Sequence, residues 1–271
     1  MKKENILIST IAPDATNVAR EYGLGIEIAE YCTAWNMDEK FAETNAEVLG
    51  KVVGIKNLVL HAPFNELFPC AIDKKARELA AFRYRQACEL AGKYGAEKVV
   101  IHAGYNERIY YPIWFTEQSA VFWKEYLNAC ERGSEEKMPN AIAKETDIEC
   151  SKGDIQIVLE NVLETEPEMM TDILEEVNSP CFKMCLDIGH VNAYSKIPVE
   201  EWLEKCAKYI SHFHIHNNNG DYDSHSALFE GSINMKEFLE RADELCPDAT
   251  FTLELLEAEP SVRWMAENSL F

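Results

Sequence analysis

Short apolar runs rich in β-branched residues alternate along the chain with longer segments in which apolar residues recur at helical spacing. Segment 74–95 ends on a glycine, and segment 198–209 begins with proline and acidic residues, as helices commonly do. Strands that alternate with helices predict βαβ units, and eight such units that close on themselves form a (β/α)8 TIM barrel. The predicted strands lie at residues 5–10, 24–29, 57–62, 98–104, 155–161, 182–187, 210–216 and 250–255.

One barrel can account for the whole chain of 271 residues, because α/β barrels of this length fold as single domains. A doubly wound open sheet is the main alternative, but no G-x-G-x-x-G motif or P-loop follows any predicted strand. The spacing between strands is longest from the fourth to the fifth, where extra polar sequence predicts an insertion at about 131–152. We therefore expect one domain over 1–271 that carries this insertion.

The composition is strongly acidic, with 47 Asp and Glu against 26 Lys and Arg and a formal net charge of −21. This balance disfavours non-specific attraction to nucleic-acid phosphates and to anionic lipid. Nine cysteines, an odd number without a C-x-x-C motif, indicate reduced thiols and a cytoplasmic protein. No apolar run approaches the ~20 residues of a membrane span, and the first residues predict a strand in place of a signal peptide. We expect no membrane partner.

The predicted strand 210–216 contains a series of histidines. Side chains of an extended strand alternate between two faces, so His212, His214 and His216 fall on one face. Asn and Gly residues then form a turn, and Asp223 and His225 follow in the loop. A surface strand with hydrogen-bonded histidines is the alternative, but three histidines in register followed by D-x-H favour a metal-binding face.

Ionisable side chains lie at or near the C-terminal ends of seven of the eight predicted strands, and this end of a TIM barrel carries the active site. Asp187 could instead cap the following helix, and Glu27 could satisfy backbone groups inside the barrel. Glu160 and Glu254 are harder to explain this way, because an unpaired buried carboxylate is costly and a divalent cation is its simplest compensation. The residues are Glu27, His61, His102, Glu160, Asp187, His216 and Glu254.

An ordered series of short motifs resembles the xylose-isomerase-like TIM barrel superfamily, which includes sugar isomerases, ketose 3-epimerases and endonuclease IV-type DNA-repair enzymes. The motifs are "LHAPF", "VIHAG", "LEN", "LDIGH", "HIHNNNGDYDSH" and "LELL", and they cover essentially the whole chain. The resemblance implies one metal ion that the family shares. We prefer His216 to His214 as its histidine ligand, because His216 lies nearer the strand end and directly before the Asn turn. The implied metal ligands are Glu160, Asp187, His216 and Glu254.

The endonuclease branch of this superfamily holds two further zinc ions, so the resemblance implies up to three Zn²⁺ under that alternative. The gap between His216 and Asp223 is short, so Asp223 and His225 could instead order the loop or contact substrate. The residues that match the two further sites are His61 and His102, with Glu160 as a bridge, and His190, Asp223 and His225.

Two activities remain open on this scaffold. The first is a sugar or sugar phosphate isomerase or epimerase, in which one divalent cation (Mn²⁺, Zn²⁺, Co²⁺ or Mg²⁺) polarises a carbonyl while Glu160 and Glu254 transfer a proton next to it. The second is an endonuclease IV-like zinc phosphodiesterase that acts on abasic DNA. The expected substrate-binding residues are His61, His102, His190, Asn218, Asp223, His225, Trp35 and Phe64.

The net charge favours the first activity, because a DNA enzyme gains much of its affinity from basic side chains on phosphates. The loops after the early strands are aromatic and acidic, which is typical of a small-molecule pocket. We therefore expect a small sugar as substrate and no nucleic-acid partner. Lyase or dehydratase chemistry, a hydride shift and a non-catalytic binding role also stay open, as do the sugar, the metal and the oligomeric state.

Overall fold

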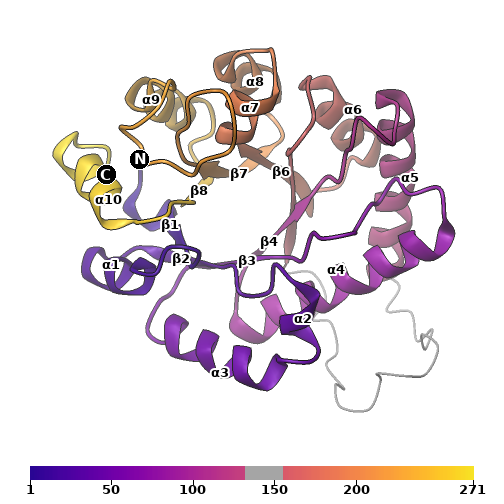
Figure 1. Cartoon of the computed structure of the whole chain (residues 1–271), viewed down its shortest axis with the longest axis horizontal. Helices are drawn as coiled ribbons and strands as arrows, with labels where there is room; N and C mark the ends of the chain where they lie inside the picture. The colour runs from indigo at the N-terminus through magenta and orange to yellow at the C-terminus, as the bar shows by residue number, and fades with distance from the viewer. Residues whose placement is uncertain (132–154) are drawn as a thin grey trace.

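The computed structural model describes residues 1–131 and 155–271, which form a closed barrel of eight parallel strands with helices around it (Figure 1). Each strand pairs with the next along the chain, and β8 pairs with β1 to close the sheet. The predicted (β/α)8 TIM barrel is confirmed. The insertion expected at about 131–152 falls on residues 132–154, outside the described part. The strands are β1 (Ile6–Ser9), β2 (Gly25–Ile28), β3 (Leu58–His61), β4 (Lys98–His102), β5 (Gln156–Glu160), β6 (Phe182–Asp187), β7 (Ile210–Ile215) and β8 (Thr250–Leu253).

Local sequence signals set the ends of several helices. Asp73 precedes α4 and accepts a hydrogen bond from the backbone N–H of Lys75 at 2.7 Å, which caps the helix. Gly95 ends the same helix at φ 76°, a left-handed conformation that glycine adopts without steric cost. None of the helices in the described residues is long and apolar enough to cross a membrane. The helices are η1 (Lys3–Asn5), α1 (Ala15–Tyr22), α2 (Ala34–Met37), α3 (Phe41–Val52), α4 (Lys74–Tyr94), α5 (Pro112–Glu131), α6 (Glu168–Val177), α7 (Ile188–Tyr194), α8 (Val199–Cys206), α9 (Met235–Leu245) and α10 (Glu259–Glu267).

Alternation along the strands creates two separate apolar clusters. Outward-facing residues pack against the helices in the main core, where Phe213 of β7 stacks on Phe251 of β8 with 4.8 Å between ring centroids. Inward-facing residues form a second, small hydrophobic cluster inside the barrel. Its members are Leu7, Val59, Val100, Val158 and Cys185.

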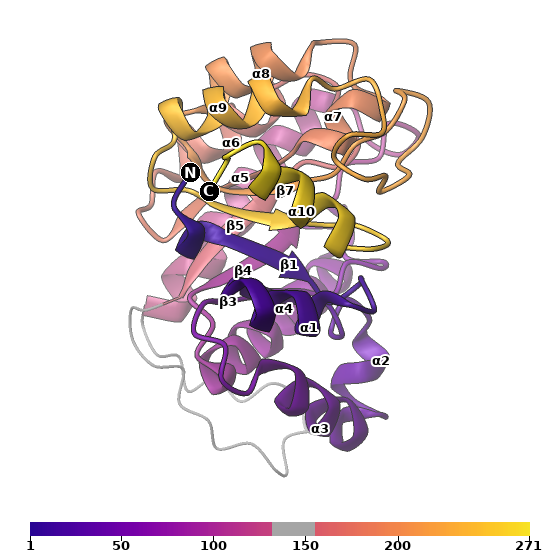
Figure 2. The ribbon, with the colours of Figure 1, turned by 90° about the vertical axis from the view of Figure 1, so that its left-hand side faces the viewer.

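The two chain ends lie side by side next to β1 and α10, as Figure 2 shows from the side of the barrel. The amino group of Met1 donates a hydrogen bond to the backbone oxygen of Leu270 at 3.0 Å and lies 3.2 Å from Asp243 Oδ2. These contacts join the first residues to α9 and to the segment that follows α10, and so help to hold β8 beside β1.

Candidate metal centre and active site

The C-terminal ends of the parallel strands bring the predicted residues to one end of the barrel. His61, His102, Glu160 and Asp187 are the last residues of β3, β4, β5 and β6, and Glu254 directly follows β8. Except for His102, which is 18% exposed, these side chains are buried. Parallel strands in register therefore place residues from distant parts of the sequence beside one another, as the TIM barrel prediction required.

Glu160 lies at the centre of this group. Its Oε2 is 3.3 Å from His61 Nε2 and 3.3 Å from His102 Nε2, and its Oε1 is 3.3 Å from His214 Nδ1. His190 Nδ1 lies 3.4 Å from the same Oε1. Burial alone would raise the pKa of Glu160, but His102 and His214 hold that pKa well below its usual range. Glu160 is therefore an ionised carboxylate that faces histidines on both sides.

His214, and not the predicted ligand His216, is the histidine nearest to the carboxylates of Glu160, Asp187 and Glu254. His214 Nδ1 lies 3.3 Å from Glu160, 3.5 Å from Glu254 Oε2 and 3.7 Å from Asp187 Oδ2. His216 contacts only Asp187 of these three, with 3.2 Å between Nε2 and the carboxylate. The reason is register: β7 pairs with β6 so that His214, not His216, stands opposite Asp187.

His216 belongs instead to the loop that carries the D-x-H residues. Its Nδ1 is 3.4 Å from Asp223 Oδ1, and its ring stacks on His225 with 4.2 Å between centroids. His225 Nε2 in turn lies 3.0 Å from Asp223 Oδ2. A Cβ added at Gly189 would stand 1.8 Å from the His216 ring, so the glycine of the "LDIGH" motif leaves the space that this ring occupies. The short gap in sequence thus does not keep Asp223 and His225 away from the site.

His190 connects the two halves of the site. Its Nδ1 lies 3.4 Å from Asp187 Oδ2, and its Nε2 lies 3.3 Å from Asp223 Oδ2. Burial lowers the pKa of His190, but Asp187 and Asp223 outweigh burial and raise it to about 10. The backbone N–H of His190 also donates to Asp187 Oδ1 at 2.7 Å, so Asp187 caps α7 as well as facing the site.

The predicted aromatic contacts differ in their position. The Phe64 ring stacks on His102 with 4.4 Å between centroids and meets His61 edge-on at 5.8 Å, which places it against the site. Trp35 is 63% exposed on the short helix α2, and its Nε1 donates to Glu39 Oε2. The structure therefore supports Phe64 as a neighbour of the site more directly than Trp35.

Asn218 is part of the scaffold of the site. Its Nδ2 donates to the backbone oxygen of Gly189 at 2.8 Å, and its Oδ1 accepts from Asn192 Nδ2 at 2.7 Å and from the Gly220 N–H at 2.9 Å. Because both ends of the amide are engaged in joining the β7 loop to α7, the structure does not favour the predicted contact of Asn218 with substrate.

The donor set fits divalent cations. Imidazole nitrogens and carboxylate oxygens within 4.8 Å of one another form several groups among the described residues, including His61–His102–Glu160, Glu160–Asp187–His190 and His216–Asp223–His225. In the same part of the chain, five buried atoms of these groups have no hydrogen-bond partner, and each is a potential metal ligand. The atoms are Glu27 Oε1, Glu160 Oε2, His214 Nδ1, His216 Nδ1 and Asp223 Oδ1.

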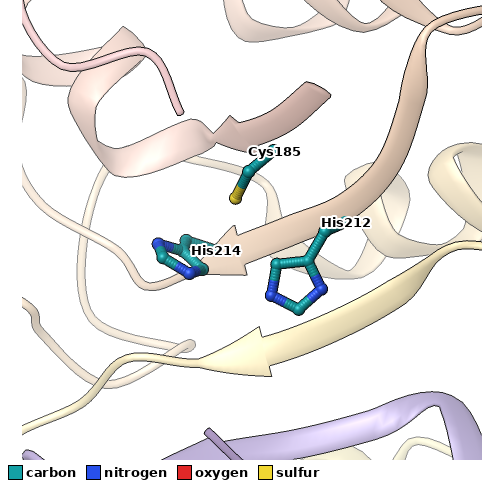
Figure 3. Close-up of side chains that lie close together, drawn as sticks. All are labelled: Cys185, His212 and His214. Atoms are coloured by element: carbon teal, nitrogen blue, oxygen red, sulfur yellow. The ribbon is translucent and has the colours of Figure 1, made fainter. Parts of the chain in front are cut away.

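A second polar layer lies directly beneath His214, and of its members the sequence predicted Glu27 at a strand end and His212 on the histidine face. Figure 3 shows Cys185 of β6 with its sulfur directed toward His212 and His214 of β7. Glu27 of β2 lies within 3.3 Å of both histidine rings and is fully buried. The alternation of residues 210–216 placed His212 on this face, but no feature of the sequence predicted that it pairs with Glu27.

Comparison with known proteins agrees with this architecture. The xylose isomerase-like TIM barrel family matches residues 18–269. The uncharacterized protein MJ1311 of Methanocaldococcus jannaschii is 31% identical over 207 residues, which are 73% of this chain and 64% of that protein. A second uncharacterized protein of the same organism, MJ1614, is 29% identical over 66% of this chain and 63% of its own length. The chain thus spans less than two thirds of the length of these curated relatives.

Solved structures of similar fold cover nearly all of the chain. A D-tagatose 3-epimerase-like protein has a TM-score of 0.73 and 24% identity, with 97% of this chain and 95% of that chain covered. The TTHB071 protein from Thermus thermophilus, soaked with ZnCl2, has a TM-score of 0.70 and 22% identity, with 98% and 97% covered. D-psicose 3-epimerase from Clostridium cellulolyticum H10, solved with D-tagatose, has a TM-score of 0.64 and 16% identity, with 92% and 84% covered. Barrel, motif order and family match agree, and the chain belongs to the xylose isomerase-like TIM barrel family.

Proposed function

We propose that this protein is a divalent-metal-dependent isomerase or epimerase of a sugar or sugar phosphate, and that one barrel domain over 1–271 carries the activity. The observation that carries the proposal is the environment of His214 Nδ1. This buried nitrogen has no hydrogen-bond partner and lies 3.3, 3.5 and 3.7 Å from carboxylates of Glu160, Glu254 and Asp187. One imidazole and three carboxylates that converge in this way suit Mn²⁺, Zn²⁺, Co²⁺ or Mg²⁺.

The metal ligands in this proposal are Glu160, Asp187, His214 and Glu254. A cation bound there would supply Lewis-acid polarisation of a substrate carbonyl. The buried carboxylates supply its counter-charge. His214 replaces His216 in the ligand set, because only His214 contacts both glutamates.

The two glutamates have different proton affinities, which suits transfer of a proton at carbon. Burial, together with the carboxylates of Glu27 and Glu160, raises the pKa of Glu254 against the opposing effects of His214 and His61, whereas the pKa of Glu160 lies well below its usual range. Glu160 is therefore ionised and has the free lone pair that accepts the proton from the carbon next to the carbonyl, and Glu254 can hold the proton that is returned to it. The carbon–hydrogen electron pair stays with the substrate as an enediolate until the second transfer.

The remaining polar groups are suited to bind substrate oxygens. His61, His102, His190, Asp223 and His225 border the ligand set through the contacts described above. Phe64 covers the two early histidines and offers an apolar face to sugar carbons. D-psicose 3-epimerase with D-tagatose and D-allulose 3-epimerase with D-allulose share the fold, which supports a small sugar as the substrate class.

A second candidate function is a multi-zinc phosphodiesterase that acts on abasic DNA. The observation in its favour is that His61–His102–Glu160 and His216–Asp223–His225 each form a compact ligand group beside the central one. Up to three Zn²⁺ are expected under this alternative. The net charge of −21 argues against it, since binding of a polyanion depends on basic side chains. A cytoplasmic location remains our expectation for both activities.

Three measurements test the proposal. Elemental analysis of the purified protein counts the metal ions per chain, and a panel of ketoses and ketose phosphates with Mn²⁺ or Co²⁺ detects interconversion. Incision of a duplex that carries an abasic-site analogue is measured in parallel with Zn²⁺. We expect metal-dependent interconversion of at least one sugar and no incision. Efficient incision without turnover of any sugar in the panel would replace the proposed function by the second candidate.

A further inference from the structure

A series of polar groups, buried near His214 and partly buried at its far end, leads from His214 to the opposite end of the barrel. It runs through Glu27 of β2, His212 of β7 and Thr250 of β8 to Lys98 of β4. The lysine and the threonine line a cavity of about 360 Å³ where the strands begin. The chemistry proposed for the metal centre does not use any of these four residues, so their arrangement requires a separate explanation.

The direction of each hydrogen bond can be deduced from Lys98. An ammonium group only donates, and Lys98 Nζ donates to the Ser211 backbone oxygen at 2.6 Å and to Thr250 Oγ1 at 2.8 Å. The Thr250 hydroxyl must then place its own hydrogen elsewhere. His212 Nδ1 is only 2.6 Å away, whereas the Ser211 oxygen is 3.4 Å away, so the hydroxyl donates to His212.

The tautomer of His212 follows from this direction. Because its Nδ1 accepts, its Nε2 carries the hydrogen of a neutral ring and donates to Glu27 Oε2 at 3.0 Å. The Thr252 hydroxyl donates to the same oxygen at 2.7 Å. Glu27 is thus held by two donors, and its remaining acceptor capacity faces His214.

The last contact determines the state of His214. Its Nε2 lies 3.1 Å from Glu27 Oε1 and 3.3 Å from Oε2, and an ionised carboxylate only accepts. In a neutral His214 ring the hydrogen is therefore on Nε2, which leaves the lone pair of Nδ1 to bind a cation beside Glu160, Asp187 and Glu254. This is the donor geometry that a metal-binding histidine needs, with its other nitrogen bonded to a carboxylate.

We propose that Glu27 is a positioning residue of the metal centre, which holds His214 in the tautomer and orientation that bind the cation and is itself held by the His212–Thr250–Lys98 chain. The inference rests on the proposed function, because it requires a cation at the strand ends. The partners of Glu27 are His212 and His214 of β7 and Thr252 of β8, so Glu27 acts through His214.

Glu27→Gln tests the role of the carboxylate. The amide keeps the size of the side chain, but only its oxygen accepts hydrogen bonds, whereas both carboxylate oxygens do. We expect Zn²⁺ and Co²⁺ to bind about 10- to 100-fold more weakly by titration calorimetry, as found when such outer partners are lost. The absorption spectrum of the Co²⁺ protein should also change, because the ligand field depends on the orientation of His214. A role in folding alone would lower the melting temperature and leave both readouts unchanged.

Ser9→Ala is the matched control. Ser9 is a buried polar residue on β1 directly opposite Glu27 in the strand register, and its hydroxyl has no hydrogen-bond partner in the described structure. We expect its metal affinity and Co²⁺ spectrum to equal those of the unaltered protein. If Glu27→Gln does not fold, Thr252→Val removes one donor to Glu27 with little change in volume and should weaken metal binding several-fold.

The outcomes separate this inference from the proposed function. Tight and equal metal binding by the unaltered protein and by Glu27→Gln, or by Thr252→Val if the first variant is unfolded, would overturn the inference alone. An unaltered protein that binds no divalent metal would overturn the proposed function and the inference with it.

Discussion

Asp187 accepts a hydrogen bond from the backbone N–H of His190 at 2.7 Å through Oδ1, while its Oδ2 lies 3.4 Å from the ring of the same histidine. One carboxylate therefore serves as the N-cap of α7 and as a member of the candidate metal centre. The two roles can be separated by substitution, because an amide caps a helix almost as well as a carboxylate but is a poor ligand for a hard cation.

The first prediction uses this separation. Asp187→Asn keeps the cap of α7, so its chelated form should be more stable than that of Asp187→Ala, and it should still lose tight metal binding and activity. Asp187→Ala should lose metal binding and also about 1 kcal/mol of stability with the cap. Denaturant unfolding of both proteins with EDTA, together with elemental analysis after metal loading, checks this. Full metal occupancy in both variants would remove Asp187 from the ligand set.

The second prediction concerns the two glutamates. Glu160→Gln and Glu254→Gln should each lower turnover of the active sugar by at least about 10²-fold, because each removes a proton carrier as well as a charged ligand. Turnover by the unaltered protein in deuterated water should place deuterium on the carbon next to the carbonyl, as mass spectrometry can detect. Turnover without incorporation would point to a hydride shift.

The third prediction concerns Gly189. A methyl group there would stand 1.8 Å from the His216 ring, so Gly189→Ala must displace that ring. We expect a loss of about 1–3 kcal/mol in the free energy of unfolding, as for other overpacked sites. Gly92→Ala in α4 is the control, since its nearest contact would be an ordinary 3.7 Å to Ile155 Cδ1. The control should be neutral or slightly stabilising.

The fourth prediction is a pH dependence of the metal-free protein. Burial lowers the pKa values of His190 and His225, but neighbouring carboxylates, chiefly Asp187 for His190 and Asp223 for His225, raise them to about 10 and about 9. A histidine whose pKa is raised on folding stabilises the protein fully below its unfolded pKa of about 6.5 and loses this effect as the pH rises through the folded value.

The stability of the chelated protein should therefore fall between pH 6.5 and about pH 10, because His190 and His225 lose their protons over this range. Melting temperatures measured with EDTA across this range check the sign, and His225→Gln should flatten the decline below about pH 9. Metal affinity should change in the opposite direction, because fewer protons compete for the ligands as the pH rises. A stability that rises steadily over the same range would contradict the assignment.

The fifth prediction separates a sugar enzyme from a DNA enzyme by electrostatics. With 47 acidic and 26 basic side chains, the protein should not bind duplex DNA measurably, even at low salt with Zn²⁺. Fluorescence anisotropy with a labelled abasic-site duplex at several salt concentrations measures this. Binding that is tight at low salt and falls steeply with added salt would show a locally basic surface and favour the phosphodiesterase.

Several features of this protein follow from sequence order alone. Apolar strands that alternate with amphipathic helices can bury their apolar faces by closing into a barrel, and the carboxyl ends of parallel strands then meet at one end. The strand-end residues His61, His102, Glu160 and Asp187 were placed together for this reason, and the structure has them within one site. The period of two along a strand likewise put His212, His214 and His216 on one face.

Only the tertiary structure decided which of these histidines lies nearest to the carboxylates. The same period that puts them on one face makes them equivalent in sequence, and their distance to the carboxylates depends on how β7 is staggered against its neighbours. A register shift between β6 and β7 sets His214 opposite Asp187. Glu254 directly follows β8, which pairs with β7, and its Oε2 lies 3.5 Å from His214 Nδ1. Glu27 stands 187 residues from His214 along the chain, and only barrel closure through β1 and β8 brings its carboxylate to that ring.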